Sequence, residues 1–199
     1  MITLKSALQH AQQAARGDLK SLETVLRELI GGSIRNTIGV EAGSGIAGIA
    51  AVYETQIVPM GDLIATKILL DLTGLNSAAT GDIIGDNGEA NCHIGRISFA
   101  ESGTPFSGLM TCLEAPATGD DDIDVYSATE STGAEDAAIT GLTETALLAS
   151  GGAWTAGQQK AMTALPADLE YLYLTSGGAG ASATYTAGKF LIEFLGLPA

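Results

Sequence analysis

The chain has 199 residues, enough for one compact domain with an appendage, and 46% of them are apolar whereas only 16% are charged. Its formal net charge is −14, but residues 1–35 hold five bases against three acids, and the rest of the chain holds four bases against twenty acids. So acidic a body repels nucleic acid and anionic membranes, and the charge therefore argues against both as partners.

A helical arm is predicted for residues 1–35. Apolar residues recur there at spacings of three and four, first in a stripe rich in alanine and then in one rich in leucine, and a pair of glycines ends the pattern. The arm has a charge sign of its own, and it lies either on its own domain or on another chain. We expect the contacts with another chain to be made by Leu4, Leu8, Ala11, Ala15, Leu19, Leu22, Leu26, Arg16, Arg27 and Arg35.

Residues 36–199 change to short segments that are rich in β-branched and aromatic residues and are bounded by Gly, Asn, Asp, Ser or Pro. Eight such segments favour a mainly β body, a β-sandwich or a jelly roll, in which two sheets pack together. Residues 143–166 have helical spacing and are predicted to hold a short helix or two, with Trp154 in the core beside them. The eight predicted strands lie in residues 37–42, 49–59, 63–75, 92–100, 108–116, 123–129, 170–176 and 188–197.

The run GSGIAG at residues 43–48 matches the glycine fingerprint of dinucleotide-binding folds. That fingerprint needs a helix directly after the glycines, so that the helix N-terminus points at a pyrophosphate. The residues that follow here alternate and contain Pro59, which predicts a strand. We therefore interpret the run as a flexible glycine hinge or a loop between arm and body.

Asp120, Asp122 and Asp124 stand at alternate positions, as in the opening of an EF-hand loop, but the glycine and the glutamate that such a loop requires are missing. Alternate residues of a strand share a face, and a cation would ease the repulsion between such close like charges. The alternatives are a solvated acidic loop and a weak calcium site completed by another loop, for example by Asp82 and Asp86. No other cofactor is expected.

Cys92 and Cys112 are too few for a disulfide framework or for a zinc site made of cysteines. If residues 93–100 and 109–115 form a hairpin, the two thiols lie nearly opposite each other; the alternative is two buried free thiols. Neither His10 nor His93 lies in a recognisable catalytic motif. We expect no catalytic residue and no enzymatic activity, and a glycan hydrolase that uses surface carboxylates is the weaker alternative.

Several stretches are distinctive as whole phrases: DLTGLNSAATGDIIGD, HIGRI, MTCLEAPATGDDDIDVYSATE, LTETALLASGGAWTAGQQKAMTALP and YTAGKFLIEFLGLP. Over roughly residues 63–199, with a similar helical start, the chain resembles a group of small virion proteins of tailed phages, especially marine ones. The resemblance implies a component of a phage particle and carries over no catalytic residue.

Small proteins of this kind are often capsid decoration or cement proteins, built as β-sandwiches with a terminal arm. The expectation is therefore a non-enzymatic homo-oligomer on the capsid surface of a virion, which binds the major capsid protein through residues 1–35 and stabilises the shell. The alternative is a tail, head-fibre or other minor virion protein that binds a host polysaccharide.

Overall fold

The computed structural model describes residues 40–48, 50, 52–77, 79–178 and 182–198, which lie in one compact unit of residues 39–199. The predicted helical arm of residues 1–35 lies outside the described residues. The described part is mainly β, as predicted, and every strand pairing in it is antiparallel.

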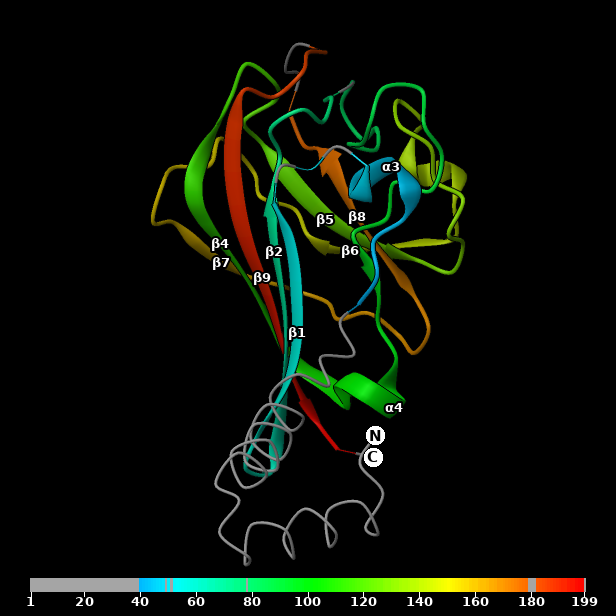
Figure 1. Ribbon diagram of the computed structural model, residues 1–199, viewed down its shortest axis with the longest axis vertical. Helices are drawn as coiled ribbons and strands as arrows, with labels where there is room; N and C mark the ends of the chain where they lie inside the picture. Colours follow the sequence, from blue (N-terminus) through cyan, green and yellow to red (C-terminus); the bar gives the residue numbers. More distant parts are fainter. Residues whose placement is uncertain (1–39, 49, 51, 78, 179–181, 199) are drawn as a thin grey trace, which may run out of the picture. The chain divides into compact units, whose positions relative to one another are not determined.

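The larger sheet has five strands in the order β1-β2-β9-β4-β7 (Figure 1). The last strand in the sequence, β9, is therefore the central strand, and it pairs with β2 on one side and β4 on the other. The bounds are β1 Tyr53–Met60, β2 Leu63–Asp71, β9 Ala187–Leu197, β4 Thr104–Ala117 and β7 Gln159–Ala161.

The smaller sheet has four strands in the order β3-β8-β5-β6. The described body also has three short helical turns, one before β1 and two between later strands. The strands are β3 Gly95–Arg96, β8 Tyr171–Ser176, β5 Ile123–Ala128 and β6 Glu144–Leu148, and the turns are α3 Ser44–Ala47, α4 Phe99–Ser102 and η1 Ile139–Gly141.

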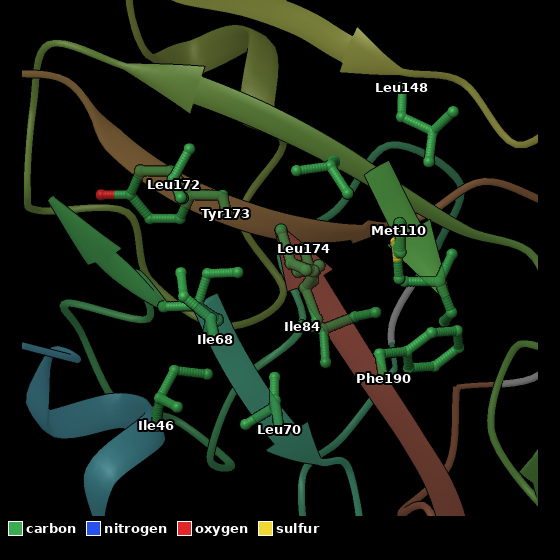
Figure 2. Close-up of a cluster of buried hydrophobic side chains, with 14 of the residues drawn as sticks. Ile46, Ile68, Leu70, Ile84, Met110, Leu148, Leu172, Tyr173, Leu174 and Phe190 are labelled. Atoms are coloured by element: carbon green, nitrogen blue, oxygen red, sulfur yellow. The ribbon is translucent and has the colours of Figure 1, made fainter. Parts of the chain in front are cut away.

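Side chains of both sheets share one buried core, because alternate residues of each strand point to the same side. On β9 the buried residues are Phe190, Ile192 and Phe194, whereas the residues between them are only half-buried. Figure 2 shows Phe190 of β9 and Ile68 of β2 in the same cluster as Leu174 of β8. Removal of this apolar surface from water is the main stabilising contribution to the fold, about 25 cal/mol per Å².

Both faces of β8 are buried, so this strand differs from an alternating one. Tyr173 is fully buried, and its hydroxyl donates a hydrogen bond to the carbonyl of Glu130 (2.7 Å) and accepts one from the N–H of Gly133 (3.3 Å). The loop that follows β5 therefore covers the face of β8 that points away from the larger sheet.

Six of the eight predicted strands are confirmed, with their ends shifted by a few residues. Of residues 37–42, only 40–42 are described, and they form no strand. Residues 92–100 contain only the two-residue β3, and α4 begins three residues after it, at Phe99. No hairpin joins residues 93–100 to 109–115, since β3 pairs with β8 and β4 pairs with β9 and β7.

The predicted helices in residues 143–166 are wrong, because this stretch contains β6 and β7. Gly151, Gly152 and Gly157 take φ values of 72°, 145° and 84°, which a right-handed helix does not allow. The expectation for Trp154 is confirmed: it is 2% exposed, its ring packs edge-on against Phe190, and its indole N–H donates to the carbonyl of Ile123 (2.9 Å).

The run GSGIAG forms α3 and packs closely against residues 91–93, so it is not a free glycine hinge. The N–H of Gly43 donates to the carbonyl of His93 (2.9 Å), and the N–H of Gly45 donates to the carbonyl of Asn91 (3.3 Å). A Cβ atom on Gly43 would lie 1.8 Å from that Asn91 oxygen. Glycine is therefore required here for close approach of two backbone segments.

Substitution Gly43→Ala is expected to destabilise the protein by about 1–3 kcal/mol, because the new methyl group meets a backbone oxygen that cannot rotate away. The free energy of unfolding, measured by urea titration, checks this. Gly141→Ala is the matched control, since nothing lies within 4 Å of a Cβ there. Equal stability of the two variants would contradict the close packing of α3.

Candidate functional site

The predicted acidic cluster lies where β4 leads into β5. Asp120 is 2% exposed, and its two carboxylate oxygens accept hydrogen bonds from the N–H groups of Asp122 and Gly178, both at 3.1 Å. Its own N–H donates to the hydroxyl of Ser77 (3.1 Å). Asp120 is thus a buried turn residue whose charge is stabilised by backbone donors.

Asp122 and Asp124 share a partner that the sequence pattern did not indicate. The hydroxyl of Ser150 donates to a carboxylate oxygen of Asp122, and the N–H of Ser150 donates to a carboxylate oxygen of Asp124. Lys160 supplies the nearby positive charge: its ammonium donates to the carbonyls of Ser150 (2.7 Å) and Gly152 (3.3 Å). The structure thus joins the acidic turn to a glycine-rich loop and to β7.

The pKa of Asp124 is raised above its ordinary value, chiefly because the carboxyl group is half-buried. The N–H of Ser150 and the charge of Lys160 act to lower this pKa, whereas the neighbouring carboxylates of Asp122 and Asp120 raise it. Lys160 therefore compensates part of the like-charge repulsion in this cluster.

Within the described residues, no group of three or more His, Cys, Asp or Glu side chains is arranged to hold a metal ion. Asp82 and Asp86, which the sequence offered as further ligands, make backbone contacts. Asp82 forms an isolated antiparallel β-bridge with Ala138, and the N–H of Asp86 donates to the carbonyl of Gly45 (2.8 Å). Calcium binding by Asp120, Asp122 and Asp124 stays a prediction.

Lys160→Met keeps a long unbranched side chain but removes the ammonium group, whose Nζ lies 4.4 Å from the centre of the Trp154 ring. We expect a loss of about 1–3 kcal/mol near neutral pH, because two carbonyls lose a charged donor and the carboxylates lose their cation. The loss should shrink as the pH falls. Without Lys160 the pKa of Asp124 rises further, and its protonation then relieves the repulsion.

Denaturant titrations over a range of pH measure this loss. Lys67→Met is the control, since Lys67 forms an ion pair with Glu193 (2.9 Å) at the surface and such pairs contribute about 0–1 kcal/mol. A pH-independent difference between Lys160→Met and the wild type would contradict the assigned role.

His93 and Cys92 lie in the core of the body, beneath α3. The His93 ring packs 4.8 Å from the ring of Tyr171 and 6.2 Å from that of Tyr173, and its buried Nδ1 atom has no hydrogen-bond partner in the described structure. Burial lowers the pKa of His93. Burial likewise raises the pKa of the Cys92 thiol to about 11, so this thiol is protonated at neutral pH and is a poor nucleophile.

Both cysteines are buried free thiols, which confirms that alternative of the sequence analysis. Cys92 lies against α3, where its sulfur is 2.4 Å from the place of a Cβ on Gly45. Cys112 lies on the inner side of β4, opposite Phe190 of β9. These thiols fill space in the core in the way that small apolar side chains do.

The pKa of His93 is lower in the folded protein than in the unfolded chain, so the unfolded chain binds the proton more readily. The stability contributed by neutral His93 is therefore complete above about pH 6.5 and is lost as the pH falls through the lowered pKa. His93→Gln should lose less stability than the wild type between about pH 7.5 and about pH 5.

The free energy of unfolding at each pH gives this comparison. His10→Gln, which removes the other histidine of the chain, is the matched variant and should keep the wild-type dependence on pH. If the free energy of unfolding depends on pH in the same way for the wild type and for His93→Gln, the role assigned to buried, neutral His93 is wrong.

The end of the larger sheet at the turn between β1 and β2 is apolar and exposed. Val58, Met60, Phe106 and Leu197 are 36%, 54%, 49% and 52% exposed, and we call these four residues the apolar end. They come from β1, β4 and β9, which lie within one sheet, and Figure 1 shows the β1–β2 turn projecting past the smaller sheet. Clusters of exposed apolar side chains mark sites of contact with other molecules.

One of these features is visible in the sequence and two are not. The alternating aspartates were visible as a pattern, but Ser150 and Lys160 reach them only through the fold. The apolar end was also missed, since its members are separated in the sequence and each is an ordinary strand residue.

The ten residues predicted to contact another chain, from Leu4 to Arg35, lie outside the described residues. Among the residues that the structure does describe, no helix is long and apolar enough to cross a membrane. Comparison of the chain with models of protein families, with curated proteins and with solved structures finds no match.

Proposed function

We propose that this chain is a non-enzymatic structural protein of a tailed-phage particle, of the capsid decoration or cement type. In this proposal it lies on the capsid surface and binds the major capsid protein through residues 1–35. The resemblance of whole sequence phrases to small virion proteins is the reason for naming a phage particle. The observation on the described body that carries an assembly role is the apolar end, which is exposed on a body in which twenty acids stand against four bases.

The positions of the reactive side chains support a role without catalysis. Cys92 has a raised pKa and His93 a lowered one, as expected of side chains held in the core in their neutral forms. Asp120, Asp122 and Asp124 are engaged by backbone N–H groups and by Ser150. The three aspartates thus have structural partners in the fold.

The proposal also includes a finer description of the body. We infer a β-sandwich, of which the jelly roll is one form, because the inner faces of both sheets contribute to a single buried core. A shell needs many identical, soluble and protease-resistant units, and an acidic β body with a separate basic arm suits that need.

Deletion of residues 1–32 is expected to give a folded, soluble body that no longer attaches to purified particles. Circular dichroism and thermal unfolding report whether the truncated protein is folded. Co-sedimentation with particles that lack this protein reports whether it attaches. Full occupancy of shells by the truncated protein would overturn the role of the arm.

Quantitative gel staining of purified virions separates the two placements in a particle. Many copies per particle are expected for a decoration protein. A few copies would instead favour the tail or head-fibre protein that binds a host polysaccharide.

A further inference from the structure

We propose that protonation of His93 releases residues 40–48, which we call the strap, from the rest of the body. The strap contains α3, and in the sequence it joins residues 1–39 to the strands. Its release in acid would therefore lengthen the connection between the predicted arm and the body. The inference does not rest on the proposed function, because it concerns contacts within the described body alone.

The backbone of the strap lies directly against the His93 ring. The N–H of Gly43 donates to the carbonyl of His93 (2.9 Å), and a Cβ atom on Gly43 would lie 2.9 Å from the Nε2 atom of the ring. His93 is 9% exposed in this arrangement. The strap is thus part of what keeps water from the ring, and lifting it would hydrate the ring.

The surroundings of the ring suit a neutral imidazole and not a charged one. Its Nδ1 atom is buried without a hydrogen-bond partner, and the ring packs against Tyr171 and Tyr173. None of the ion pairs between described residues includes His93. An imidazolium ion has two N–H donors and a positive charge, which need an acceptor or water. Charged His93 is therefore stable only when water reaches it.

The charged groups on the segments around His93 do not supply that acceptor. Glu41 of the strap is exposed, and the guanidinium of Arg96 lies 5.7 Å from the centre of the Tyr171 ring, so it adds a second positive charge beside the same aromatic neighbour. The carboxylates of Glu130, Glu135 and Glu170 accept hydrogen bonds from other residues. The other titratable groups on these segments are Asp86, Glu89, Cys92, Tyr171 and Tyr173.

The strap is held less firmly than the core strands. Its buried apolar side chains are Val40 and Ile46, and the hydroxyl of Tyr53 lies 2.8 Å from the carbonyls of both Val40 and Ile94. Central strand β9, by contrast, is paired on both sides. Segments with few buried apolar contacts open at a lower free energy than core strands do. The strap can therefore open while the sheets stay intact.

Protonation of His93 and opening of the strap are linked. Burial lowers the pKa of His93 in the closed form, whereas a hydrated ring has the ordinary pKa of about 6.5. The ratio of open to closed molecules then rises by up to about tenfold for each pH unit below about pH 6.5, until the lowered pKa is reached. Near neutral pH the strap is closed.

Hydrogen–deuterium exchange of the full chain, corrected for the intrinsic effect of pH on exchange, tests this inference. From about pH 7.5 to about pH 5, protection of the strap amides should fall by up to about tenfold per pH unit, while the β9 amides stay far better protected. His93→Gln should remove this dependence on pH, and the control His10→Gln should keep it. Strap protection that does not change with pH in the wild type overturns the inference, and so does exchange of the strap and β9 together.

A second measurement keeps His93 in place and opens the strap instead. Gly43→Ala introduces a methyl group that meets the Asn91 carbonyl and the His93 ring. In this variant the pKa of His93, followed by NMR of the ring protons, should rise towards about 6.5. The second histidine, His10, is the internal reference and should titrate alike in both proteins. The same His93 titration in Gly43→Ala and the wild type would contradict the linkage, as would a His93→Gln variant whose strap still opens in acid.

Discussion

The rest of the structure depends on the packing of two antiparallel sheets around β9. This strand is central in the larger sheet, and its inward side chains Phe190, Ile192 and Phe194 lie in the core to which both sheets contribute. The side chains between them point to the opposite side of the sheet and are less buried. Lys189 and Glu193 form ion pairs there, whereas Leu197 ends the strand as an exposed apolar side chain. One alternation thus determines both the core and the candidate contact surface.

The same core accounts for the surroundings of His93 and Cys92. His93 and Cys92 are held in their neutral forms under α3, and the glycines of GSGIAG allow that segment to approach them. The acidic turn is likewise tied to the body, through Ser150 and Lys160. The body has a large excess of acids over bases and exposes four large apolar side chains at the apolar end, a combination that suits the proposed assembly on a large particle.

Local alternation made much of the fold predictable, but pairing between distant segments was not. Residues 188–197 alternate clearly, and β9 lies there. The stretch around Leu147 has helical spacing, yet three glycines with positive φ and the pairing of β6 with β5 make it strand and loop. Residues 93–100 and 109–115 form no hairpin, because β3 pairs with β8 and β4 pairs with β9, which are distant in the sequence. Ser150 was missed at the acidic turn for the same reason.

A cryo-electron microscopy map of the purified particle tests the central claim most directly, since it gives the location, the copy number and the contacting residues together. The account predicts many copies on the outer surface of the capsid, with density for residues 1–35 against the shell. A map in which the protein occupies a few tail positions, or in which residues 1–35 of every copy touch no neighbouring protein, would contradict it.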